Sequence, residues 1–189
     1  MPRRVLVMGF GPFQSVTDNP AERLARQIDG IACGGVTFVG RVMPVSFTRA
    51  VATTQRLIGE FSPSLLVGVG VATSRQVITV EMCGHNVGCG TTPDVDGQRR
   101  SIIDPEGPDK VMVSLPPQPL ASLLGAVVGD DAGRYVCNAW IYQMLRAVSP
   151  DLPVGFIHIP PAGLPATRLA NALAKIEDSP DGTHTEVHR

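Results

Sequence analysis

The chain has 189 residues, with 16 basic and 17 acidic side chains and no block of basic residues. This length is typical of one globular domain, and we expect residues 1–189 to form one domain with its own core. The near-zero charge argues against nucleic acid or an anionic membrane as a partner. The apolar run 5–8 is too short for a signal peptide, and no run could span a membrane. We therefore expect a cytoplasmic enzyme or binding protein.

The first 30 residues predict a strand, a turn and a helix. Residues 4–8, of which 5–8 are apolar, predict a buried strand. The segment 9–13 contains two glycines and a proline, which predict a tight, exposed turn carrying Phe10 and Phe13. Asn19 and Pro20 then have the residue types of a helix N-cap and first helical position.

The next segments continue an alternation of strands and helices. Residues 36–45 predict a second strand, and Ser46 is the expected N-cap of a helix that Pro63 ends. Residues 65–71 predict a third strand, apolar on both faces like a central parallel strand. This order predicts an α/β fold with a mostly parallel sheet.

The second half continues this order around a long irregular segment. Residues 84–109 are rich in Gly, Pro and Asp, and we expect an irregular loop or small hairpin over the sheet edge. Loops of this length inside a compact domain are usually functional. The remaining expectations are strands at 77–82, 111–115 and 154–159, a helix from Pro119 through Val127, a last helix at 165–176, and a loose polar tail at 178–189.

Cys137 is the first candidate nucleophile. It follows the helix-breaking segment 130–133 and should lie in the first turn of a helix, where the helix dipole favours the thiolate. His158, within the predicted strand 154–159, is the best candidate for its general base. A cysteine at a helix start is more often a buried apolar residue, and a histidine in such a strand is more often a core residue. Residue type alone leaves both alternatives open.

Four motifs in this order resemble the pyroglutamyl peptidase I family of cysteine peptidases, also called pyrrolidone-carboxylate peptidases. The resemblance covers residues 5 to about 176. The motifs are Gly-Phe-Gly-Pro-Phe at 9–13 with Asn19 and Pro20; Arg75 followed by Ile-Thr-Val-Glu at 78–81; Tyr-Val-Cys-Asn at 135–138 with Tyr142; and Phe-Ile-His-Ile-Pro at 156–160.

The resemblance implies an open α/β/α sandwich of one domain with a twisted central sheet. It also implies hydrolysis of the amide after an N-terminal pyroglutamyl residue, in a peptide or small amide, without a cofactor or metal. A homo-oligomer, dimer or tetramer, is the implied assembly. The implied residues are a catalytic triad of Cys137, His158 and Glu81, and a substrate site of Phe10, Phe13, Asn19 and Tyr135.

Some positions differ from the family pattern. Val71, Thr73 and Ser74 replace a glutamine and two glycines, and Thr91 replaces an arginine associated with the oxyanion. The loop after Thr91 and the residues after Glu81 also differ. These changes leave open an amidohydrolase or acyl-transfer enzyme for another small cyclic or blocked acyl amide, and a non-catalytic binding homologue.

The other cysteines suggest no catalytic role. Without secretory context we expect reduced thiols. Cys83, His85 and Cys89 are residue types that bind zinc, but their spacing is not that of a standard site, so packing roles are favoured. Cys33 has no evident role, and His184 and His188 lie in the tail. Trp140 is either a pocket wall or a core residue.

Overall fold

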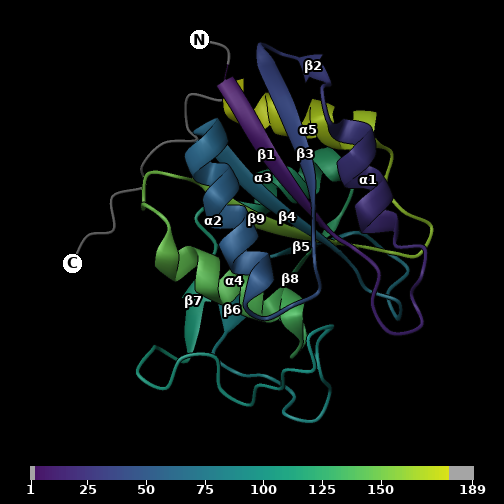
Figure 1. Cartoon of the computed structure of the whole chain (residues 1–189). Coiled ribbons are helices and arrows are strands. Elements are labelled where there is room, and N and C mark those ends of the chain that lie inside the picture. The colour runs from purple at the N-terminus through teal and green to yellow at the C-terminus, as the bar shows by residue number, and fades with distance from the viewer. Residues whose placement is uncertain (1–2, 179–189) are drawn as a thin grey trace.

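A seven-stranded sheet forms the centre of the computed structural model, which describes residues 3–178 (Figure 1). The strand order is β2-β3-β1-β4-β9-β5-β8. Strands β3, β1, β4 and β9 are parallel, β2 is antiparallel to β3, and β5 and β8 run opposite to β9. The predicted mostly parallel α/β sheet is confirmed. Its strands are β1 (Arg3–Phe10), β2 (Ala32–Cys33), β3 (Val36–Met43), β4 (Leu65–Val71), β5 (Thr79–Glu81), β8 (Val127–Gly129) and β9 (Val154–Ile159).

Helices cover both faces of this sheet, as the resemblance implied. Side chains alternate along β1, so Val5 and Val7 pack in one core and Leu6 and Met8 in the other. The Val5 core includes α1 (Pro20–Ile28), α3 (Pro117–Leu124) and α5 (Ala166–Asp178); the Leu6 core includes α2 (Arg49–Phe61) and α4 (Val136–Ala147). The three layers thus follow from the period of two in the strands.

A separate two-stranded sheet lies beside α4. In the chain, its strands come between β5 and β8 of the main sheet. Strands β6 (Cys83–His85) and β7 (Lys110–Met112) are antiparallel, and the loop 86–109 connects them (Figure 1). A Cβ atom on Gly84 would lie 2.7 Å from the backbone nitrogen of Tyr142, so β6 packs directly on the backbone of α4. The expected loop or small hairpin is confirmed.

Several predicted boundaries were wrong. Phe10 is not on an exposed turn but is the last residue of β1, only 1% exposed. The second helix begins at Arg49 with Thr48 as its N-cap, rather than directly after Ser46, although the Ser46 hydroxyl still accepts a hydrogen bond from the Arg49 N–H. Val127 is in the strand β8, because Gly125, with a φ of 54°, ends α3 at Leu124.

The remaining differences concern short strands and the C-terminus. Strand β2 was not predicted, because two residues carry no readable periodicity. Asp178 is the last residue of α5 rather than part of the tail, and residues 179–189 lie outside the described residues. Among residues 3–178, no helix has the length and apolar character needed to cross a bilayer.

The close approach of α1 to β3 yields a test of the packing. A Cβ atom on Gly40 would lie 1.8 Å from the Ala25 carbonyl oxygen, whereas one on the exposed helical Gly59 would meet nothing within 4 Å. Gly40→Ala should therefore lower the free energy of unfolding by about 2 kcal/mol or more. Gly59→Ala should raise it by up to about 1 kcal/mol. Urea denaturation of both variants measures this difference, and equal effects would contradict the packing.

Candidate active site

Cys137 lies in the first turn of α4, as predicted. It faces the end of β4, where Gly70 has no side chain. A Cβ atom on Gly70 would lie 2.9 Å from the Cys137 sulfur and 3.4 Å from Cδ2 of His158. The thiol and Cδ2, the ring carbon next to Nε2, therefore occupy neighbouring space beside this glycine.

His158 and Glu81 form a direct hydrogen bond. Nδ1 of His158 lies 2.7 Å from Oε1 of Glu81. The Glu81 side chain is completely buried, and His158 is 5% exposed. With Nδ1 occupied, Nε2 is the nitrogen that faces away from the carboxylate. The structure thus brings together the three residues predicted as a triad, in the order thiol, imidazole, carboxylate.

Arg75 is a second partner of the buried carboxylate. Its guanidinium forms an ion pair with Oε1 of Glu81 at 2.5 Å and also donates a hydrogen bond to the Asp131 carbonyl. Within the described part of the chain, Oε2 of Glu81 is buried and has no hydrogen-bond partner. Arg75 and the imidazole share one oxygen, so the charge of Glu81 is compensated from that side alone. The sequence identified Arg75 only as part of a motif, without this role.

The thiol of Cys137 is not activated in the way that its helix position suggested. Burial, and then the negative charge of Glu81, raise the pKa of Cys137 to about 12, although its own backbone N–H and the Arg75 charge lower it. The residue as a whole is half-buried. The predicted preference for the thiolate was therefore wrong for the resting protein, because desolvation outweighs the helix dipole.

Asn138, the residue after Cys137, fixes the start of α4 to β6. Its side-chain carbonyl accepts a hydrogen bond from the His85 N–H at 2.8 Å, and its amide donates to the carbonyls of His85 and Val87 at 2.8 and 2.9 Å. The side chain is fully buried. The sequence analysis missed this role, and only its place in the Tyr-Val-Cys-Asn motif pointed to Asn138.

Three aromatic side chains pack together just before the start of α4, in the same apolar cluster as Cys137. The Tyr135 ring lies 6.2 Å from that of Phe13 and 5.8 Å from that of Phe47, measured between centroids. Burial raises the pKa of the Tyr135 hydroxyl, which donates a hydrogen bond to the Pro93 carbonyl. Phe13, Phe47 and Tyr135 thus form an aromatic wall. Phe47 was not among the predicted site residues.

Phe10 and Asn19 are both buried. Phe10 is buried in the core, with its ring 6.3 Å from that of Phe156. Asn19 is 1% exposed; its side chain accepts from the Ala21 N–H and donates to the Gly11 carbonyl. Asn19 thus connects the start of α1 to the segment that carries Phe13, whereas Phe10 packs into the core.

Comparisons with known proteins agree with this geometry. A sequence model of the pyroglutamyl peptidase family matches residues 3–173. The chain therefore belongs to the pyroglutamyl peptidase family. The pyrrolidone-carboxylate peptidase of Mycobacterium tuberculosis is 34% identical over 170 residues, which cover 83% of this chain and 77% of the relative. That of Pyrococcus furiosus is 33% identical over 167 residues, covering 83% and 80%.

Solved structures of the family have the same fold. Pyroglutamyl peptidase I from Bacillus amyloliquefaciens superposes with a TM-score of 0.83 at 28% sequence identity, covering 92% of each chain. A mutant pyrrolidone carboxyl peptidase from Pyrococcus furiosus gives a TM-score of 0.80 at 29% identity, covering 92% of this chain and 96% of that one.

Two of the positions that differ from the pyroglutamyl peptidase pattern, Val71 and Thr91, lie in different surroundings. Val71 is the last residue of β4 and is buried, whereas Thr91 is exposed, and its carbonyl accepts a hydrogen bond from Arg99. Asp94, 6% exposed, fixes the loop that contains Thr91 by accepting a hydrogen bond from the Phe47 N–H. A threonine at position 91 cannot supply the charge of an arginine.

Cys83 in β6 and Cys89 in the loop after it make local contacts. The Cys83 sulfur lies 3.4 Å from Nε2 of His85 and donates to the Asp130 carbonyl at 3.2 Å. The sulfur of Cys89 accepts a hydrogen bond from the Thr92 N–H. Among residues 3–178, no three His, Cys, Asp or Glu side chains are arranged to hold a metal ion. His184 and His188 lie outside the described residues.

Trp140 is a core residue rather than a pocket wall. Its side chain has no exposed surface, its ring packs 5.7 Å from that of Phe156, and its Nε1 donates to the Thr54 hydroxyl. Of the two roles that the sequence left open for Trp140, the structure supports the core residue.

The raised pKa of Cys137 predicts slow alkylation near neutral pH. Because a thiolate reacts and a thiol does not, the rate of iodoacetamide labelling at Cys137 should rise about tenfold per pH unit between about pH 6.5 and 9.5. At pH 7 it should be slower in the native protein than in urea. Peptide mapping by mass spectrometry separates Cys137 from the other cysteines. A rate already constant at pH 7 would show that His158 holds the thiol proton at rest.

Proposed function

We propose that this protein is a cysteine exopeptidase that hydrolyses the amide bond after an N-terminal pyroglutamyl residue. The observation that carries the proposal is that Cys137 and His158 share the space beside Gly70, while the Glu81 carboxylate is bonded to Nδ1 of His158 and leaves Nε2 available. This arrangement is that of a nucleophile, its base, and the group that orients the base. Membership of the pyroglutamyl peptidase family supports the substrate.

In the proposed reaction His158 acts first as a base. It takes the Cys137 proton through Nε2 as the sulfur attacks the carbonyl carbon of the pyroglutamyl residue. The buried Glu81 stabilises the imidazolium that forms. The backbone N–H groups in the first turn of α4 would stabilise the oxyanion. His158 then protonates the leaving amine, and water hydrolyses the thioester.

The aromatic wall supports selection of an uncharged ring. A lactam is flat and neutral and can pack against Phe13 and Tyr135. A free α-ammonium in the same place would lose its hydration without gaining a counter-ion, which is costly. Thr91 is the observation that favours a second candidate, an amidohydrolase for another small cyclic or blocked acyl amide, because the oxyanion would lack the arginine.

Two further expectations belong to this proposal. A cytoplasmic location suits an enzyme that depends on a reduced thiol, because the cytosol keeps thiols reduced. The dimer or tetramer implied by the resemblance is tested by light scattering of the purified protein.

Hydrolysis of a pyroglutamyl-coumarin amide tests the function. The protein should turn over this substrate, and Cys137→Ala should abolish the reaction because no other group can form the thioester. The matched control, Cys33→Ala, removes a thiol from β2 and should keep wild-type turnover. Activity confined to other blocked acyl amides in a substrate panel would favour the second candidate. A single burst of amine without turnover would indicate a binding homologue.

Replacing the buried acid tests the triad separately. Glu81→Gln keeps the shape but removes the charge that stabilises the imidazolium, so kcat should fall at least about 100-fold. Glu60→Gln, on the exposed surface of α2, removes the same charge far from the site and should leave kcat unchanged. Steady-state kinetics on the coumarin amide compare the two. Near-wild-type kcat in Glu81→Gln would remove Glu81 from the mechanism.

A further inference from the structure

Arg75 joins the proposed triad to the segment that leads into α4. One nitrogen of its guanidinium forms the ion pair with Oε1 of Glu81 at 2.5 Å, and another donates a hydrogen bond to the Asp131 carbonyl. A planar guanidinium holds two such acceptors in fixed relative positions. Arg75 therefore links β5, which carries Glu81, to the segment 130–134 between β8 and α4.

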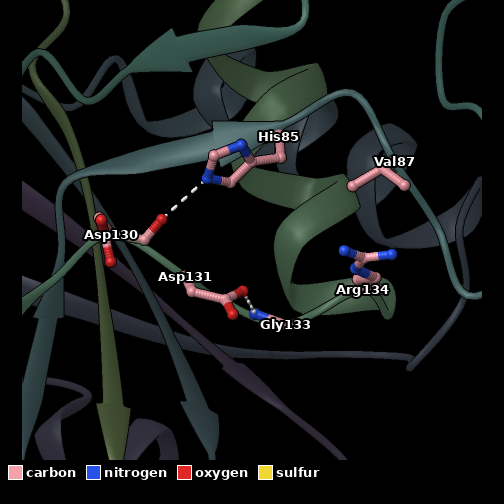
Figure 2. Close-up of a pocket in the computed structure, with 6 residues that line it drawn as sticks. All are labelled: His85, Val87, Asp130, Asp131, Gly133 and Arg134. Atoms are coloured by element: carbon pink, nitrogen blue, oxygen red, sulfur yellow. Dashed lines mark hydrogen bonds between the residues drawn. The ribbon is translucent and has the colours of Figure 1, made fainter.

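The Asp131 carbonyl is a well-anchored partner because the chain around it is held on both sides. The Asp131 carboxylate accepts a hydrogen bond from the Gly133 N–H at 2.9 Å, and Nε2 of His85 bonds to the Asp130 carbonyl at 2.8 Å. Figure 2 shows both hydrogen bonds in the lining of a cavity of about 350 Å³. The segment is thereby fixed to β6 and gives the guanidinium a stable point from which to hold Glu81.

Glu81 depends on Arg75 for its position. The carboxylate is completely buried, and in the described part of the chain its side chain bonds only to Arg75 and His158. Its other oxygen, Oε2, has no hydrogen-bond partner among these residues. Without Arg75, the imidazole would be the one remaining described partner of a buried carboxylate. No second described hydrogen bond would then keep Oε1 directed at Nδ1.

Arg75 can act on the reaction only through Glu81. Its guanidinium binds that carboxylate and a backbone carbonyl, and its side chain is 29% exposed. The hydrogen bond that Glu81 makes with His158 decides, in turn, which ring nitrogen carries the proton. A proton on Nδ1, donated to Glu81, leaves Nε2 as the base.

The charge of Arg75 has two opposite effects on the reacting pair. It lowers the pKa of Cys137 and so favours the thiolate, although burial and the Glu81 charge outweigh it. The same charge disfavours an imidazolium at His158, since both groups bind one oxygen of Glu81. The two effects oppose each other when the proton moves from the sulfur to Nε2. Position is therefore left as the main contribution of Arg75.

We propose that Arg75 is the positioning residue of the triad: by holding Glu81 against Nδ1, it keeps the proton of the neutral His158 on Nδ1 and leaves Nε2 free to accept the thiol proton. The inference rests on the proposed function and adds a fourth residue to it. Arginine suits this role because its fork binds the carboxylate and the Asp131 carbonyl together, whereas a lysine ammonium lacks this fixed fork.

Steady-state kinetics on the coumarin amide test the role. Arg75→Gln should lower kcat about 100-fold and change KM less than about threefold, because misplacing a catalytic group affects the reaction step. Arg75→Lys keeps the charge and should recover about tenfold of this loss. Arg41→Gln is the matched control, because Arg41 also binds a carboxylate, that of Asp29, and a backbone carbonyl, but lies on β3; its kcat should stay at the wild-type value. A kcat in Arg75→Gln equal to or above that of the wild type would overturn the proposal.

A double variant shows whether Arg75 acts through Glu81. In the Glu81→Gln background, adding Arg75→Gln should lower kcat less than about threefold, because the carboxylate that Arg75 positions is already absent. A further loss as large as that of Arg75→Gln alone would indicate a separate structural effect and would contradict the positioning role.

The imidazole proton provides a readout that needs no substrate. In protein with isotopically labelled histidine nitrogens, NMR of the neutral imidazole of His158, assigned by its loss in His158→Asn, should show the proton on Nδ1. Arg75→Gln should move part of this proton to Nε2, and Arg75→Lys and Arg41→Gln should leave it on Nδ1. An unchanged tautomer in Arg75→Gln would overturn the proposal.

Failure of the positioning role and failure of the proposed function are distinguishable. If the wild-type protein hydrolyses the coumarin amide and Arg75→Gln does so equally well, the function stands and the role of Arg75 is wrong. If the wild-type protein does not hydrolyse it, the tautomer of His158 still decides the role. If Arg75→Gln does not fold, Arg75→Lys decides: a kcat about tenfold below the wild type supports the role, and a wild-type kcat overturns it.

Discussion

The buried carboxylate of Glu81 is the constraint on which the rest of the site depends. An isolated charge in a protein interior costs on the order of several kcal/mol after relaxation. Arg75 and the imidazole of His158 offset this cost at a single oxygen of Glu81. Because Arg75 also binds the Asp131 carbonyl, the same ion pair connects the segment after β4 to the segment that leads into α4. The orientation of the imidazole and the path of the chain toward Cys137 are therefore linked.

The sheet provides space for these side chains through glycines on neighbouring strands. Gly70 in β4 leaves room for Cys137 and His158, and a Cβ atom on Gly129 in β8 would lie 2.9 Å from Oε2 of Glu81. The direction of β5 matters as well. In the antiparallel pairing of β5 with β9, Thr79 lies opposite His158, two residues before Glu81. Alternate residues share a face of a strand, so the carboxylate can reach back to Nδ1.

The sequence predicted the features that local chemistry determines. The Asn19 cap, the position of Cys137 in the first turn of α4 and the buried strand around His158 follow from residue types at short range. Features that depend on distant partners were missed. The three-residue β8 exists because it pairs with β5, and Asn138 acts through contacts with β6. The resemblance, rather than periodicity, joined Glu81 to the other two residues.

The pKa of Cys137 shows how tertiary environment reverses a local expectation. A helix N-terminus stabilises a thiolate, but here burial and the nearby Glu81 charge outweigh it. A neutral resting thiol does not weaken a mechanism in which His158 removes the proton during attack. The Glu81 charge that disfavours an isolated thiolate favours an imidazolium bonded to it. The site is therefore better suited to the charge-separated pair of thiolate and imidazolium than to a thiolate alone, which makes the imidazole necessary for forming the nucleophile.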